Sequence, residues 1–286
     1  MSETSVKDEP SQNPDQLFFK HLARAFGGAI VFSFPLLMTM EMWFLGGSMK
    51  GFRLALYTLL IIPLLIGLSY YDGFEATSSI LDDTVDTFVA YAVGFTTSIA
   101  LLFLFSVIKF EMSADELIGK ISIQAIVGSF GAMFAQSLLL GDDQGSEEKA
   151  NRRRAASYFG ELFLMAIGAI YLSMSVAPTE EVALISYQMS DWHTLALIIV
   201  TLLLMHAFVY FAEFRGQEKA HLHGKSFMKG FLRFTVVGYA LALIISAYIL
   251  WTFGSIDETN SAEMLKTVVV LGFPAAVGAS ASRFIL

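Results

Sequence analysis

Eight stretches of about twenty residues dominate the sequence, each rich in apolar side chains and nearly free of charge. A helix needs about 20 such residues to cross the hydrocarbon core of a bilayer. Inside that core every backbone amide must be hydrogen-bonded within its own segment, so an all-α bundle of membrane helices is predicted. The predicted spans are 26–46, 52–71, 87–109, 118–140, 155–177, 192–213, 234–254 and 264–284.

Composition supports lipid as the main solvent. Hydrophobic residues make up 55% of the 286 positions and charged residues only 15%, against about 25% charged in soluble domains. A single soluble core could not hide eight such stretches. We therefore expect membrane lipids as partners. The net charge of −8 argues against nucleic acid as a partner, because phosphate binding needs a basic surface.

The termini and the charged loops predict the topology. Residues 1–20 are polar, without a basic segment followed by an apolar core, which predicts a disordered tail and no cleaved signal. With the N-terminus inside, thirteen of the 18 Lys and Arg residues fall on the inner side. The outer side holds the other five, which are Lys50, Arg53, Lys109, Lys120 and Lys266. Both termini are therefore expected in the cytoplasm.

An internal repeat is predicted from a shift of 140 residues. The shift places "GAIVFSFPLLMTMEMW" (28–43) on "GAIYLSMSVAPTEEVA" (168–183), and "SADEL" (113–117) later matches "SAEML" (261–265) after a small drift. Four spans per copy would insert both copies the same way round, as a parallel repeat. The predicted organisation is a tail (1–20), a first four-helix repeat (21–140), a linker (141–154) and a second repeat (155–286).

The repeat pairs two carboxylates within apolar surroundings. Glu41 matches Glu181, and each follows a threonine two positions earlier, Thr39 and Thr179. On a straight helix from Phe26, Glu41 would lie about 22 Å along the span, in its outer third. One hypothesis is that both glutamates line an outer vestibule and attract a cation or proton. The alternative, equally weighted, is that both merely reach the outer headgroups.

A second candidate pair is Glu161 with His206. Both are expected at similar depth on consecutive antiparallel spans, which are usually neighbours. A carboxylate beside a histidine could relay protons. A buried hydrogen bond that only fixes helix packing is the favoured alternative.

Small residues at intervals of four mark predicted contacts between helices. One span contains Gly128 and Ala132, with Gly131 alongside. Another contains two such series, which are Gly272, Ala276 and Ser280, and Pro274, Gly278 and Ser282. Such spacing lets backbones approach closely, and packing is its ordinary role. A cavity lined by Ser280, Ser282, Gln124 or Gln136 is the alternative.

Several other signals predict no chemistry. The acidic segment 72–86 lacks the spacing of a calcium loop and is expected to be a solvated connection. Two histidines in "HLH" (221–223) are too few ligands for a metal site. Nucleotide-binding and proteolytic motifs are missing from the sequence, and with no cysteines it has no thiolate chemistry. Neither an enzyme, a metal site nor a cofactor is expected.

The blocks "FGGAIVFSFPLLMTMEMWFLG" (26–46) and "VAPTEEV" (176–182), together with the span layout, resemble a family of bacterial multi-pass integral membrane proteins. The resemblance covers nearly the whole chain after the tail and implies the bacterial cytoplasmic membrane. It implies no activity, since none is assigned to the family.

Three functions remain open from the sequence. The first is a transporter or channel for a cation or proton that uses Glu41, Glu181, Thr39, Thr179, Glu161 and His206. The second is a membrane assembly or sensor component that transports nothing, and homo-oligomers are compatible with either. The third and weakest is a membrane-embedded enzyme acting on lipid or quinone.

Overall fold

The chain folds as a bundle of helices. The computed structural model describes residues 14–72, 79–139, 157–216 and 231–285, and every regular element in these ranges is helical. The elements are α1 (Pro14–Leu37), α2 (Met40–Ser48), α3 (Gly51–Asp72), α4 (Ile80–Leu104), α5 (Ala114–Leu139), α7 (Tyr158–Val176), α8 (Glu180–Gln188), α9 (Asp191–Gly216), η1 (Phe231–Val236), α11 (Val237–Phe253) and α12 (Ser261–Ile285).

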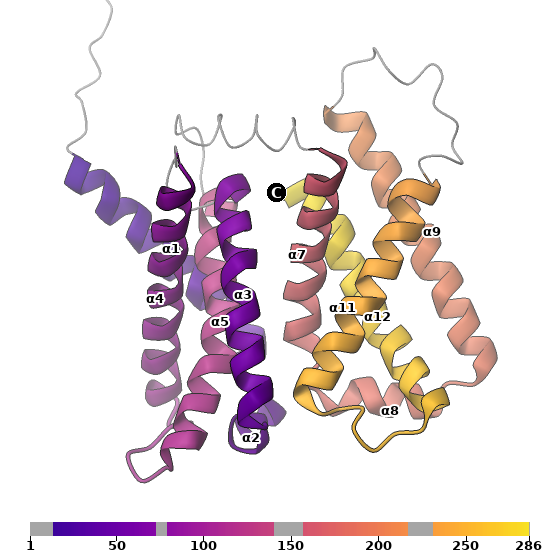
Figure 1. Cartoon of the computed structure of the whole chain (residues 1–286), viewed down its shortest axis with the longest axis horizontal. Helices are drawn as coiled ribbons and strands as arrows, with labels where there is room; N and C mark the ends of the chain where they lie inside the picture. Colours follow the sequence, from indigo (N-terminus) through magenta and orange to yellow (C-terminus); the bar gives the residue numbers. More distant parts are fainter. Residues whose placement is uncertain (1–13, 73–78, 140–156, 217–230, 286) are drawn as a thin grey trace, which may run out of the picture.

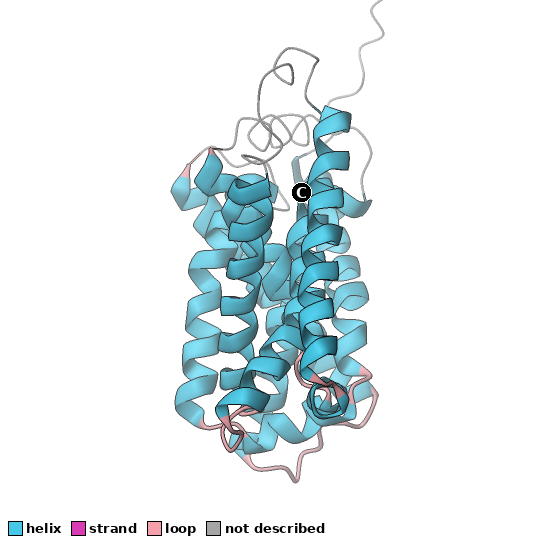
Figure 2. Cartoon of the chain, turned by 90° about the vertical axis from the view of Figure 1, so that its right-hand side faces the viewer, coloured by secondary structure: helices cyan, strands magenta, loops and turns pink. Residues whose placement is uncertain are grey.

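The predicted membrane class is confirmed. Among the described residues, seven helical segments are long and apolar enough to cross a bilayer, and η1 and α11 together form one of them. The number rises to eight when the bent pair α1–α2 is taken as one span. Figure 2 shows the long helices standing side by side, with short loops at their ends.

Polar side chains close several helix ends, which explains where these elements begin. Ser79 and Asp82 form a capping box at the start of α4, with each side chain bonded to the backbone amide of the other. Ser157 accepts the Gly160 amide at the start of α7, and Asn260 accepts two amides at the start of α12. Such caps satisfy amides that have no partner inside the helix.

Two helices form the cores of the two halves of the molecule, residues 14–139 and 157–285. In the first half, α5 contacts α1, α2, α3 and α4; in the second half, α12 contacts α7, α8, α9 and α11. Of the α5 span, 83% is buried, against 11% of the α9 span. Figure 1 shows the halves side by side, with α2 and α8 at the same end of the bundle.

Each core helix meets the first helix of its half at a pair of glycines. A Cβ atom on Gly28 would collide with the carbonyl of Gly131, and one on Gly131 would collide with Gly28. Gly168 of α7 and Gly278 of α12 make the same reciprocal contact. The predicted close approach of helices at small residues is thus confirmed.

The two halves share a regular spacing of elements. The starts of α2 (Met40) and α8 (Glu180) lie 140 positions apart, as do the starts of α3 (Gly51) and α9 (Asp191). Ser106 and Gly254, which have the positive φ angles among the described residues, follow the last turns of α4 and α11. These spacings agree with the predicted duplication, which stays a prediction until the halves are superimposed.

The halves are joined by aromatic contacts and by an ion pair between Arg53 and Asp257. Tyr57 of α3 packs against Phe253 of α11, with ring centroids 5.7 Å apart. Beyond it, Arg53 donates two hydrogen bonds of 2.8 Å to the Asp257 carboxylate in the α11–α12 loop. The Arg53 guanidinium also lies 4.8 Å from the ring centroid of Trp251. Bidentate pairing of this kind holds both side chains in one geometry.

The predicted tail was too long. Helix α1 already begins at Pro14, a residue type suited to the first turn of a helix because its missing amide would have no partner there. The predicted tail residues 1–13 and the whole predicted linker, 141–154, lie outside the described residues.

We predict that Gly28→Ala separates α1 from α5 and lowers the free energy of unfolding by about 1–3 kcal/mol, the usual cost of overpacking. Thermal unfolding in detergent measures this loss. The control is Gly51→Ala, because no atom lies within 4 Å of a Cβ at that position. Equal melting temperatures for the two variants would contradict the close contact.

We also predict a pH-dependent contribution from Asp257. The hydrogen bond from Arg53 lowers the pKa of this carboxyl from its ordinary value, so the folded state favours the carboxylate. At neutral pH, Asp257→Asn should lower the free energy of unfolding by up to about 1 kcal/mol. The contribution is complete above the unfolded pKa of about 3.9 and is lost as the pH falls through the lower folded pKa. The melting temperatures of parent and Asp257→Asn should therefore differ at neutral pH and approach each other as the pH falls below about 4. At neutral pH the control Glu258→Gln should melt like the parent.

Candidate functional site

The two predicted threonine–glutamate pairs lie where long helices break. Thr39 and Thr179 precede α2 and α8 with extended backbones, at φ −94°, ψ 113° and φ −76°, ψ 139°. The Thr39 hydroxyl donates to the Pro35 carbonyl and the Thr179 hydroxyl to the Val176 carbonyl, both at 2.9 Å. Both hydroxyls therefore bond to the final turns of the preceding helices.

The predicted straight first span, 26–46, was wrong. Helix α1 ends at Leu37, and α2 is bent from it by 88°. In a continuing α-helix the Thr39 amide would donate to the Pro35 carbonyl, four residues back. Here the Thr39 amide donates instead to the Leu36 carbonyl, and the Thr39 hydroxyl donates to the Pro35 carbonyl. Because the turn is closed in this way, Glu41 lies on a separate helix. The depth expected for Glu41 on a straight span does not apply.

Glu41 and Glu181 occupy equivalent places in the short helices. Glu41 is half-buried in the first turn of α2, and Glu181 is exposed in the first turn of α8. Carboxylates are stabilised in a first helical turn by the partial positive charge of the free amides. A local structural role therefore accounts for both residues. Their predicted role in an outer vestibule stays a prediction.

Glu161 and His206 lie on α7 and α9, as expected. His206 Nδ1, however, is 3.1 Å from the Thr235 hydroxyl of η1, and the Phe231 ring meets the His206 ring edge-on at 5.3 Å. The Thr235 hydroxyl is thus a hydrogen-bond partner of this nitrogen. The proton relay between Glu161 and His206 stays a prediction.

A buried acidic pair forms the strongest polar feature that sequence reasoning missed. Asp83 and Asp86 lie in the first two turns of α4, and each is only 4% exposed. The hydroxyl of Ser69, on α3, is 2.6 Å from Asp86 Oδ2 and 3.2 Å from Asp83 Oδ1. One hydroxyl of a fully buried serine therefore lies between two carboxylates.

The expectation that segment 72–86 is a solvated connection was wrong for its second part. Residues 80–86 form the start of α4, while residues 73–78 lie outside the described residues. Asp83 and Asp86 are three positions apart, so they share the helix face that continues through the buried Thr87 and Ala90. The sequence signal that could have found them is this spacing ahead of an apolar helix.

The acidic pair can bind a positive charge. Their carboxylate oxygens, buried at the start of a membrane helix, are groups that a small cation or proton can bind. The Ser69 hydroxyl has a single proton, which the shorter distance assigns to Asp86. In the described ranges no three His, Asp or Glu residues are grouped so as to hold a metal ion.

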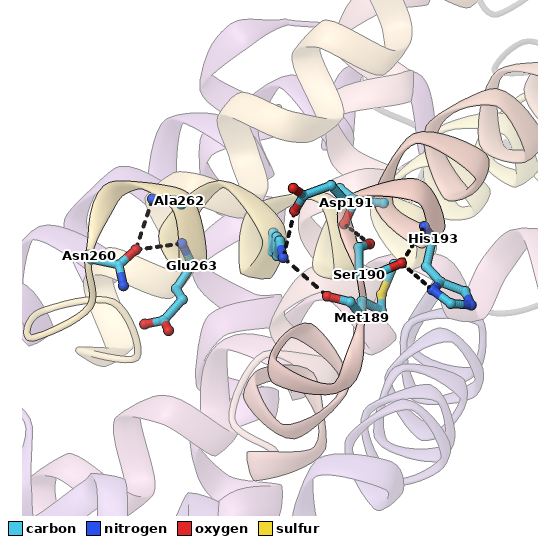
Figure 3. A network of polar contacts seen from close by, with 9 residues as sticks. Met189, Ser190, Asp191, His193, Asn260, Ala262 and Glu263 are labelled. Atoms are coloured by element: carbon cyan, nitrogen blue, oxygen red, sulfur yellow. Dashed lines mark hydrogen bonds and ion pairs between the residues drawn. The ribbon is translucent and has the colours of Figure 1, made fainter.

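A separate polar network lies in the second half, where the junction of α8 and α9 meets α12. The Lys266 amine lies 3.1 Å from the Met189 carbonyl and 2.8 Å from the Asp191 carboxylate. Figure 3 shows Met189, Ser190 and Asp191 next to one another at the α8–α9 junction. His193 Nδ1 lies 2.7 Å from the Ser190 hydroxyl in the same region. The contacts tie the α8–α9 junction to α12, so their role is structural.

An apolar groove of about 510 Å³ lies between α1 and α4. Its lining residues are Phe18, Leu22, Phe26, Val85, Phe88, Val89, Ala92, Val93 and Thr96. Phe18 and Phe88 are 41% and 56% exposed, as expected for a surface in contact with lipid. The groove offers no charged side chain for catalysis.

We predict that Ser69→Ala destabilises the protein by about 1–3 kcal/mol, because two buried carboxylates lose a shared donor. Chemical or thermal unfolding in detergent measures the loss. Thr84→Ala is the control, since that hydroxyl donates to the Ile80 carbonyl within its own helix. A loss no larger than that of Thr84→Ala would show that Ser69 is unimportant to the pair.

Comparison with known proteins identifies the family without adding an activity. No curated protein and no solved structure matches the chain. The sequence profile of the family described as "Putative integral membrane protein (DUF2391)" matches residues 21–286, which is nearly the whole chain. This match agrees with the multi-pass helical bundle and with the resemblance noted from the sequence. The chain therefore belongs to this family of integral membrane proteins.

Proposed function

We propose that the protein moves a proton or small cation across the membrane, and that Asp83 and Asp86 form a binding point on its path. The observation that supports this proposal most directly is the pair itself. Two aspartates, each 4% exposed, lie within the first two turns of a membrane-crossing helix and share the Ser69 hydroxyl. Charged side chains are costly inside a membrane and commonly mark ion or proton pathways.

The position of the pair suits entry from one side of the membrane. Ser69 lies near the end of α3 and Asp83 near the start of α4, at the end of the bundle opposite α2. The bias of Lys and Arg supports a cytoplasmic location for this end, in a bacterial cytoplasmic membrane. Glu41 and Glu181 would then serve the opposite entrance. The regular spacing of the two halves supports a transporter built from parallel repeats.

A non-transporting assembly or sensor component is the second candidate. The observation in its favour is the close packing at Gly28–Gly131 and Gly168–Gly278, where helix backbones touch and leave no room for water. A rigid bundle of this kind could present its membrane surface to other proteins or to a second copy of itself. Measuring flux separates the two candidates, since the component would carry none.

The test is flux in proteoliposomes. Protons, Na⁺, K⁺ and Li⁺ are each followed with the parent protein, with Asp83→Asn, with Asp86→Asn and with the double variant Glu41→Gln/Glu181→Gln. We expect the parent to carry one of these ions and each aspartate variant to lose at least tenfold in rate, because the amide holds no negative charge. The double variant is expected to carry the ion more slowly than the parent.

Asp115→Asn is the matched control, because this aspartate is exposed in the first turn of α5. It should carry the ion at the parent rate. Absence of flux for every ion with correctly folded parent protein would reject transport and favour the second candidate. Parent-like flux in both aspartate variants would remove the acidic pair from the path.

A further inference from the structure

The first half contains a second set of buried polar atoms, deeper in the bundle than the acidic pair. Thr97 and Ser98 of α4 and Gln124 of α5 are 4%, 0% and 0% exposed. Their Oγ1, Oγ and Oε1 atoms have no hydrogen-bond partner among the described residues. Such an atom costs about 1–3 kcal/mol when it is buried without a partner. A bound ligand is one physical reason for keeping three of them.

Helix geometry places the three residues at one level of the bundle. Helices α4 and α5 cross at Gly94, where a Cβ atom would meet the Ala125 carbonyl and the Ser129 side chain. The two helices run antiparallel, so one turn beyond this crossing lie Thr97 and Ser98 on α4 and residues 121–124 on α5. The layer is about 16 Å further along α4 than Asp86.

The orientation of the Gln124 amide follows from its partner. Its Nε2 donates to the Ser33 carbonyl of α1 at 2.8 Å. A carbonyl can only accept, so the nitrogen must point to Ser33, and Oε1 is the end without a partner. The atom of this amide that remains without a hydrogen bond is therefore an oxygen, which can coordinate a cation.

The hydroxyls of Thr97 and Ser98 also lack the usual hydrogen bond to a backbone carbonyl of their own helix. Thr87 and Ser129, on the same two helices, donate to carbonyls four residues back at 2.8 and 2.7 Å. Serine and threonine inside helices commonly make this bond. Thr97 and Ser98 do not make it, so their oxygens remain available.

We propose that this layer binds a dehydrated monovalent cation through Gln124 Oε1, Ser98 Oγ and Thr97 Oγ1. Neutral carbonyl and hydroxyl oxygens replace the hydration shell of such ions in membrane proteins. The site deepens the proposed transport function and rests on it for its biological role. It would be the next binding point after Asp83 and Asp86.

The second half provides a matched comparison. Ser246 stands eight residues before Gly254, and Ser98 stands eight residues before Ser106, the other residue with a positive φ angle among those described. The Ser246 hydroxyl is buried and also has no hydrogen-bond partner among the described residues. Leu271 stands seven residues before Gly278 of the glycine contact in the second half, as Gln124 stands seven residues before Gly131 of the contact in the first half. The second half thus has the hydroxyl without the amide, so the cation site is expected in the first half alone.

The earlier sequence alternative of a cavity around Ser280 and Ser282 is not supported. Both hydroxyls donate to carbonyls of their own helix, Ala276 and Ala279, at 2.9 Å. The Gln136 side chain lies outside the described residues. Of that set, only Gln124 enters the proposed site.

The test measures melting temperature in detergent with LiCl, NaCl, KCl or choline chloride at equal ionic strength. A bound cation stabilises the folded state by mass action, so one small cation should raise the melting temperature by several degrees over choline. Gln124→Leu and Ser98→Ala should lose this shift. Ser246→Ala should keep it. Leucine at position 124 copies the residue at the equivalent position 271, and size-exclusion elution confirms that each variant is folded.

Several results would overturn the site. They are a parent without any cation-specific shift, a shift that persists in both Gln124→Leu and Ser98→Ala, and a shift that Ser246→Ala removes equally. In the first case the buried oxygens hold water at most. If Gln124→Leu does not fold, Ser98→Ala alone decides. A cation-dependent rise in melting temperature without ion flux would reject transport but support the cation site. Ion flux without such a rise would support transport and reject the site.

Discussion

The contact of backbone with backbone at two pairs of glycines sets the geometry on which the rest of the bundle depends. Gly28 meets Gly131 in the first half, and Gly168 meets Gly278 in the second. In lipid, helices gain little by hiding apolar side chains from one another, so close packing has to hold them together. With α5 and α12 fixed against α1 and α7, the other helices of each half can pack around two buried cores.

Breaks in two long helices determine where Glu41 and Glu181 lie, because each break starts a separate short helix. At Thr39 and Thr179 the threonine hydroxyl and amide close the last turn, and a nine-residue helix follows in a new direction. These breaks account for Glu41 and Glu181, whose carboxylates stand in the first turns of α2 and α8. A carboxylate inside an apolar block is therefore explained by a local change of direction, without any need for a ligand at those residues.

The chemistry that could serve a function is concentrated in the first half. Asp83, Asp86 and Ser69 form a buried acidic pair, and Thr97, Ser98 and Gln124 form a neutral layer further into the membrane. The second half has leucine in place of the amide, and Phe231 and Phe234 stand where the spacing from Gly254 would place the two aspartates. Two halves of similar layout thus carry different polar content. In a transport protein this asymmetry would place the buried binding points in the first half.

The amino-acid sequence by itself determined the membrane class, the approximate spans and the sites of close helix contact. These properties depend on runs of about twenty apolar residues and on small residues at intervals of four, which are local and periodic. Tertiary structure decided the rest. The bend at Thr39 depends on which carbonyl its hydroxyl reaches, and the burial of Asp83 and Asp86 depends on Ser69 of a neighbouring helix. One partner of His206 is Thr235, which lies 29 positions away in the chain. Composition and periodicity record which residues prefer lipid, but a polar side chain finds its partner only when separate helices pack together.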